Sequence, residues 1–232
     1  MTVTPFRLGL ALAGACVGTA AHSETYRLQV ILAGSVLGTM EYQTDAADGG
    51  RPAGLSTNLD NTPLGVVNGT WVATSQPVRT GSGATALQFL ATTASGRKNR
   101  VISVLHADGQ VLATEVEPAE DATELSVSEN VPAGIIDPVE AFGRLFDTDG
   151  CPEPFRLYDG RRVVEVVTTG SEEASGLLTC QLDYEVIAGP GHLSPFRFNS
   201  FDLELTYVET ATGSVLAEAD VSAGPFTVRL VR

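Results

Sequence analysis

The chain has few of the residues and none of the motifs that most catalytic and metal sites use. Its 232 residues include three cysteines, three histidines and one tryptophan. No His-Glu-x-x-His motif, paired-cysteine zinc spacing, Gly-x-Ser-x-Gly elbow, phosphate-binding P-loop or Gly-x-Gly-x-x-Gly motif is present. The sequence therefore predicts a protein that is not an enzyme and that uses no cofactor or metal.

Positive charge is also scarce. Lysine and arginine number 14 against 28 aspartates and glutamates, so the formal net charge is -14. A chain with this charge repels nucleic acid and anionic lipid surfaces, which argues against DNA or RNA as a partner. After the first residues, no apolar run reaches the roughly 18 residues needed to span a bilayer, so no membrane span is expected.

The first 23 residues have the pattern of an export signal. Arg7 precedes a small and apolar run over residues 8–21, and Ala21 and Ser23 provide the small residues that a signal peptidase recognises. We therefore expect cleavage after Ser23, a single β-rich domain over residues 24–232, and a periplasmic location. Cys16 offers a second interpretation as a lipoprotein site, but the large apolar residue usual three positions before the cysteine is missing.

Removal of the signal would leave only Cys151 and Cys180. An even number of cysteines in an exported protein predicts a disulfide, and closing this loop would stabilise the fold by roughly 3 kcal/mol. Two buried free thiols are the alternative interpretation.

Alternation of apolar and polar residues over many short segments predicts an all-β fold. The clearest case is residues 201–207, and Asp-Gly turns at 108–109 and 159–160 are strong hairpin signals. We count about 11 strands with hairpin-length connections, which favours an antiparallel β-barrel or a strongly curved sheet.

One short helix is predicted within this β pattern. Asp137 is placed to cap it, Pro138 suits the first helical position, and Glu140 lies three residues after the cap. Phe142 and Phe146 fall on an apolar stripe that must be buried, either across a barrel mouth or in the concave face of a curved sheet.

Large aromatic residues near this helix and on the strands are candidates for lining a ligand cavity. Trp71 has two interpretations, a core residue, which a strand setting favours, and a ligand wall. The full candidate set is Trp71, Phe142, Phe146, Tyr184 and Phe201.

Four segments together give the chain a family resemblance. They are Tyr-Arg-Leu-Gln-Val at 26–30 before a glycine-rich hairpin, Ile-Asp-Pro-Val-Glu-Ala at 136–141, Tyr-Asp-Gly-Arg-Arg at 158–162, and Cys180 leading to Ile-Ala-Gly at 187–189. In this order and spacing, over most of the mature chain, they resemble the DUF3108 family of exported proteobacterial proteins, whose function is unknown. The resemblance implies a periplasmic β-rich fold and transfers no catalytic residue.

Three functional hypotheses follow. The first is a non-enzymatic envelope protein whose curved sheet encloses a lipid or other apolar ligand, or binds an envelope partner. The second is an exported hydrolase that uses carboxylates with His106 or His192 in a cleft. The third, an outer-membrane barrel, conflicts with the short strands and the final Arg232. It also conflicts with Cys180, which alternation over residues 177–187 places on the inward face with Leu178 and Leu182.

Overall fold

A computed structural model describes seven stretches of the chain, residues 24–44, 53–62, 68–96, 98–146, 148–192, 197–210 and 213–232. The predicted export signal and the Cys16 lipoprotein site lie outside the described residues. The described part is mostly β, as predicted, and its strands form a single sheet of 14 strands. The predicted count of about 11 is too low.

The strands fall into two groups. The first group is β1 (Thr25–Leu32), β2 (Ser35–Gln43), β3 (Ala53–Leu59), β4 (Gly69–Arg79), β5 (Thr85–Ser95), β6 (Asn99–Ala107) and β7 (Gln110–Glu117). The second group is β8 (Ile135–Ile136), β9 (Phe155–Tyr158), β10 (Val163–Ala174), β11 (Leu177–Ala188), β12 (Ser200–Thr210), β13 (Gly213–Ala223) and β14 (Phe226–Val231).

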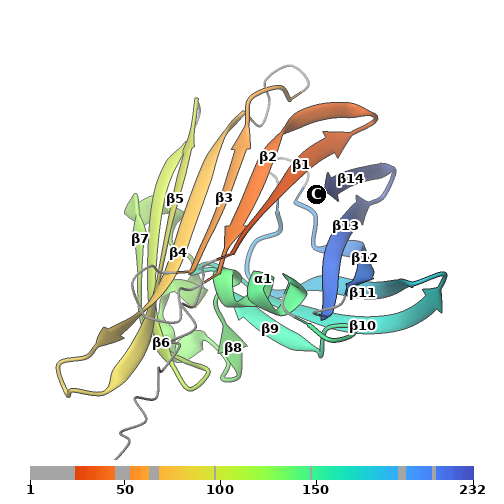
Figure 1. Cartoon of the computed structure of the whole chain (residues 1–232). Helices are drawn as coiled ribbons and strands as arrows, with labels where there is room; N and C mark the ends of the chain where they lie inside the picture. The colour runs from red at the N-terminus through yellow and green to blue at the C-terminus, as the bar shows by residue number, and fades with distance from the viewer. Residues whose placement is uncertain are drawn as a thin grey trace, which may run out of the picture.

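The first and last strands of the chain are neighbours in the middle of the sheet. Its order is β7-β6-β5-β4-β3-β2-β1-β14-β13-β12-β11-β10-β9-β8, so each group is a meander and the two meanders join where β1 pairs with β14. All pairs are antiparallel except β8 with β9, which are parallel. The sheet curves so strongly that it forms a nearly closed, barrel-like wall around a concave face (Figure 1).

Tight turns with the expected residues set the register of the hairpins. Asp108 and Gly109, both with positive φ, join β6 to β7. Gly160, with φ of 91°, lies in the turn between β9 and β10. A side chain at Gly160 would meet Ile102 of β6, so this glycine also allows the β9–β10 turn to pack against the first meander.

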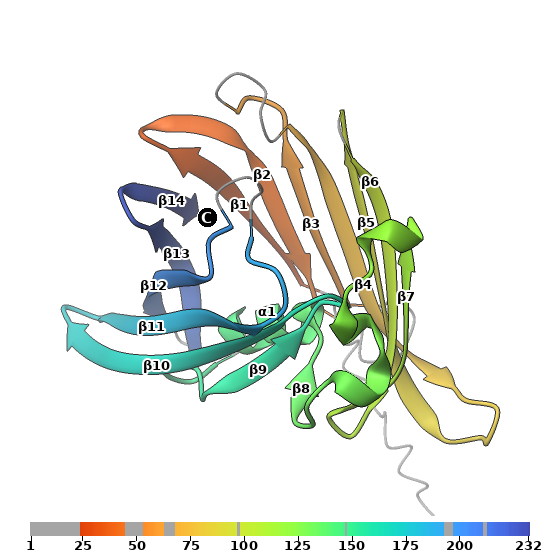
Figure 2. The ribbon, with the colours of Figure 1, turned by 180° about the vertical axis from the view of Figure 1, so that it is seen from behind.

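The path between the two sheet edges, β7 and β8, contains three short 3-10 helices, and the helix α1 (Pro138–Phe146) follows β8. The 3-10 helices are η2 (Ala119–Asp121), η3 (Glu124–Ser126) and η4 (Ser128–Asn130), all near β7. Seen from behind, they stand beside the outer strands of the first meander, while α1 lies within the curve of the sheet (Figure 2).

The helix α1 packs in the concave face and bridges the two meanders. It contacts β3 and β4 of the first meander and β9 and β13 of the second. Val139, Ala141 and Phe146 are buried, and the Phe146 ring lies 4.9 Å from that of Tyr26 between centroids. Of the two placements predicted for the apolar stripe, the structure therefore shows the concave one.

The predicted disulfide is present. Cys151, just after α1, is bonded to Cys180 of β11, with their Cα atoms 5.6 Å apart. Cys180 is fully buried, as its inward-facing position in the alternating pattern predicted. The bond therefore ties the segment that follows α1 to the second meander.

Candidate functional site

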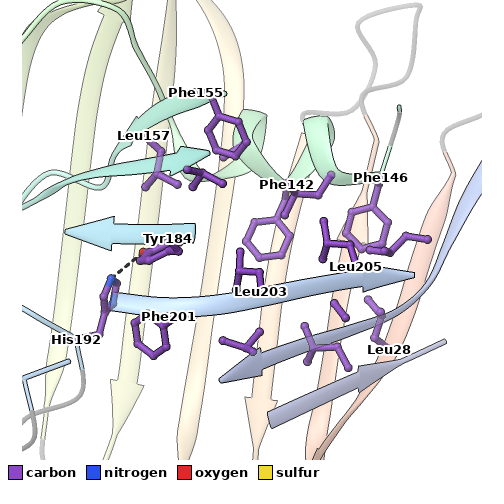
Figure 3. A pocket seen from close by; sticks show the side chains of 17 residues that line it. Leu28, Phe142, Phe146, Phe155, Leu157, Tyr184, His192, Phe201, Leu203 and Leu205 are labelled. Atoms are coloured by element: carbon purple, nitrogen blue, oxygen red, sulfur yellow. Dashed lines mark hydrogen bonds between the residues drawn. The ribbon is translucent and has the colours of Figure 1, made fainter. Parts of the chain in front are cut away.

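The main candidate site is a cavity of about 350 Å³ between α1 and the concave face of the second meander. Of the 17 described residues that line it, only Tyr184 and His192 have a polar group in the side chain. The close-up shows the residues extending from His192 and Phe201 at one end to Phe146 and Leu28 at the other (Figure 3). This shape and lining suit an elongated apolar molecule.

Strand alternation explains why these side chains converge. Leu203 and Leu205 lie two residues apart on β12, so both point to the concave face, and Phe142, Leu145 and Phe146 face them from α1. Residues from β9, β10, β11, β13, β14 and β1 complete the wall, together with His192. The cavity therefore depends on the curvature that brings α1 and these strands together.

The polar end of the cavity is a tyrosine–histidine pair. The Tyr184 hydroxyl and His192 Nε2 lie 2.7 Å apart and share a hydrogen bond. The Phe201 ring is 5.5 Å from the ring of Tyr184 and 5.6 Å from that of His192, which encloses the pair on one side. The cavity is therefore apolar along its length, with one pair of polar side chains at its end.

Both members of this pair are uncharged at neutral pH. Burial lowers the pKa of His192 from 6.5 to about 4. The positive charge of Arg162 lowers it further, and the negative charge of Asp159 opposes the shift. Burial also raises the pKa of the Tyr184 hydroxyl, with a contribution from the Asp159 carboxylate. Asp159 and Arg162 form their own ion pair at 2.9 Å. The pair therefore offers a neutral donor and acceptor to a ligand.

Four of the five aromatic residues named as candidates from the sequence lie on the wall of this cavity. Phe142, Phe146, Tyr184 and Phe201 line the cavity, whereas Trp71 does not. Trp71 lies on β4 between Thr57 and Thr93 of the neighbouring strands, in the first meander, and packs partly buried against the core. Its sequence setting showed that it was in a strand but not which half of the sheet that strand joined.

A second cluster of polar residues surrounds the N-terminus of α1. We call it the cap cluster, and its members are Ser75, His106, Asp137 and Glu140. Asp137 Oδ1 accepts hydrogen bonds from the backbone amides of Val139 at 2.7 Å and Glu140 at 3.0 Å, and Glu140 Oε2 accepts one from the Asp137 amide at 3.3 Å. This is the reciprocal capping arrangement expected for Asp137 and Glu140. Both residues therefore fix where α1 starts.

The other oxygen of Asp137 joins the helix to two strands. Oδ2 accepts a hydrogen bond from the Ser75 hydroxyl of β4 at 2.6 Å, and it lies 3.0 Å from His106 Nε2 of β6. Glu140 Oε2 lies 3.7 Å from the same nitrogen. Burial and the Asp137 charge raise the pKa of Glu140. No local pattern indicated this convergence, since Ser75 and His106 lie on strands remote from Asp137 in the chain.

These positions bear on the hydrolase hypothesis. His106 and His192 each line a cavity, but not the same one. The Ser75 hydroxyl donates to Asp137, and the aspartate stands between Ser75 and His106. A serine nucleophile needs the histidine beside its own oxygen, so the Ser75, Asp137 and His106 arrangement lacks the order of a hydrolytic triad.

Among the described residues, no helix is long and apolar enough to cross a lipid bilayer. A comparison of the chain with family models, curated proteins and solved structures finds no match. The resemblance to the DUF3108 family therefore stays an expectation from sequence, and the cavity and the cap cluster are what the structure offers as evidence for function.

Proposed function

We propose that this protein is an exported, non-enzymatic binding protein that holds one apolar small molecule in the cavity between α1 and the second meander. The observation that supports this proposal is the lining, in which Tyr184 and His192 alone among the 17 described residues have a polar side-chain group. A volume of about 350 Å³ falls at the lower end of the range of small-molecule sites, roughly 300–1,000 Å³.

The proposed ligand is a slender lipid-like molecule with one uncharged polar group. Its apolar part would lie along Leu203, Leu205 and Phe146, where it replaces contact with water by contact with side chains. Its polar group would meet the Tyr184–His192 pair, which is neutral and can both donate and accept.

The proposed location is the periplasm. The Cys151–Cys180 bond suits an oxidising compartment. An exported carrier or sensor of an apolar molecule agrees with the predicted signal over residues 1–23. Comparing the N-terminus of the protein isolated from an envelope fraction with Glu24 tests this part of the proposal.

A pair of matched substitutions tests the binding site. Val221→Phe places a large ring in the cavity, whereas Val72→Phe makes the same change at an exposed position of β4. With the neutral apolar fluorophore N-phenyl-1-naphthylamine as probe, we expect Val221→Phe to weaken binding at least about tenfold, because the ring removes the space that the probe fills. Val72→Phe should bind as the unchanged protein does.

Native mass spectrometry of the protein purified from its envelope fraction provides the second measurement. We expect one bound small molecule of a size that fits a cavity of about 350 Å³, and we expect Val221→Phe to reduce the amount bound. Probe binding that is equal in the two variants, or no probe uptake by the unchanged protein, would overturn the proposal.

A further inference from the structure

The cap cluster at the N-terminus of α1 brings together three metal-ligating atoms on two elements. They are His106 Nε2 from β6, and Asp137 Oδ2 and Glu140 Oε2 from the start of α1. Nε2 lies 3.0 Å from the Asp137 oxygen and 3.7 Å from the Glu140 oxygen, and all three atoms lie within 4.8 Å of one another. The cluster is thus compact enough for all three to reach one ion.

These separations agree with the geometry of a small dication. Zinc binds imidazole nitrogen and carboxylate oxygen at about 2.0–2.2 Å, so two ligand atoms at tetrahedral angles lie roughly 3.3 Å apart. The two separations that involve Nε2 fall on either side of this value. Shifts of a few tenths of an ångström in the Glu140 side chain would equalise them, and that side chain is 35% exposed.

Binding of an ion would disturb little of the hydrogen bonding already present. Asp137 Oδ1 would keep both backbone amides, and the Ser75 hydroxyl would still donate to Oδ2. The His106 to Asp137 hydrogen bond would be replaced by two bonds to the metal, and Glu140 Oε2 would bind the metal through a lone pair other than the one that accepts from the Asp137 amide. Ser75 and the two amides would then act as the supporting contacts that orient a metal-binding carboxylate.

Two of the three residues are buried, and an open pocket lets an ion reach them. Asp137 is fully buried and His106 is 3% exposed, so two of the three ligands are held rigidly by the fold. His106 and Glu140 also line an open pocket of about 290 Å³, together with Asp108, Gly109 and residues of β5 and β8. An ion could enter from this pocket and keep a water on the side that faces it.

We propose that His106, Asp137 and Glu140 form a binding site for one divalent transition-metal ion, with zinc as the preferred ion. Two carboxylates and one neutral imidazole give the site a formal charge that a dication balances, and the nitrogen ligand favours zinc over magnesium or calcium. The ion joins β6 to α1 and so strengthens the attachment of the helix to the first meander. This site is separate from the apolar cavity and does not depend on the proposed function.

Zinc titration of the tag-free mature protein, after treatment with a chelator and its removal, tests the proposal. We expect native mass spectrometry to show one zinc ion per chain, and isothermal titration calorimetry to give one site. The thermal unfolding midpoint should rise with zinc, because an ion that binds only the folded chain stabilises it. Magnesium at the same concentration should produce neither result.

Two variants and a control assign the ion to these residues. Glu140→Gln keeps the size of the side chain and an oxygen for the helix cap, so the fold should persist while zinc affinity falls at least about tenfold. His106→Gln should abolish the site. His192→Gln removes the other described histidine and should bind zinc as the unchanged protein does.

The results separate the outcomes clearly. No zinc uptake by the unchanged protein would overturn the proposal, and so would Glu140→Gln and His106→Gln variants that bind zinc with unchanged affinity. If His106→Gln does not fold, Glu140→Gln against His192→Gln decides the question alone. Probe binding in the apolar cavity is measured independently, so failure of one proposal leaves the other standing.

Discussion

The helix α1 borders two sites with opposite chemistry. At its N-terminus, Asp137 is hydrogen-bonded to Ser75 and His106 of the first meander, and Glu140 Oε2 lies 3.7 Å from His106 Nε2. Further along, Phe142 and Phe146 line the apolar cavity against the second meander. One short helix thus anchors to one half of the sheet through polar groups and leaves space against the other half.

The two described histidines show the same difference. The His106 ring lies beside the carboxylates of Asp137 and Glu140 in a polar cluster. The His192 ring is hydrogen-bonded to a tyrosine hydroxyl at the end of an apolar space. Buried polar groups that are fully paired fix a geometry, whereas a single polar pair in an apolar wall leaves contacts for a ligand to complete. The cap cluster is therefore the rigid side of α1 and the cavity is its adaptable side.

The largest expected effect is at the cap cluster. Asp137→Ala should lower the free energy of unfolding by about 3 to 5 kcal/mol, because it removes the helix cap and leaves Ser75 and His106 buried without their shared acceptor. Urea unfolding followed by circular dichroism measures this change. Asp137→Asn should lose clearly less, since asparagine also caps helices. Equal losses in the two variants would mean that the helix cap, which asparagine retains, contributes nothing to the stability of this end of α1.

The dependence of the free energy of unfolding on pH tests His192, at the polar end of the cavity. The folded-state pKa of His192 is about 4 against 6.5 for a free histidine, so between these values the unfolded chain binds a proton that the folded chain does not. The contribution of His192 is therefore fully present above pH 6.5 and is lost as pH falls toward 4, by about 2 to 3 kcal/mol.

The His192→Gln variant isolates this contribution from those of the many carboxylates. Its unfolding free energy should fall less steeply between pH 6.5 and 4 than that of the unchanged protein, measured by urea unfolding at each pH. Tyr184, Arg162 and Asp159 remain in both proteins. Parallel curves for the two proteins would show that His192 becomes protonated freely in the folded state.

The smallest effects come from deleting one hydroxyl at each site. Ser75→Ala removes a buried hydrogen bond to a carboxylate and should cost about 1.5 to 3 kcal/mol, whereas Tyr184→Phe removes a bond between neutral groups and should cost about 0.5 to 1.5 kcal/mol. Chemical unfolding of both variants under one condition gives the comparison. A larger cost for Tyr184→Phe would reverse the assignment of the rigid and adaptable sides.

Local patterns predicted much of the fold. Asp108-Gly109 and Asp159-Gly160 each placed a turn between paired strands, because these residues adopt the backbone angles that tight turns need. Strands with poor patterns were missed or misjudged. The β3 segment Ala-Gly-Leu-Ser-Thr-Asn-Leu is rich in small and polar residues, and β8 has only two residues. Such segments become strands through their neighbours in the sheet, which no local pattern records.

Residue order alone was enough to predict the alternating strands, the capped start of α1 and the two cysteines available for a disulfide. Each depends on residues near one another in the chain or on a simple count. The folded chain was needed to show that β1 pairs with β14 and that His106 reaches Asp137. It was also needed to show that Tyr184, His192 and Phe201 close one end of a cavity. These contacts follow from the curvature of the whole sheet, which sums small twists over many strands and has no signature in any one of them.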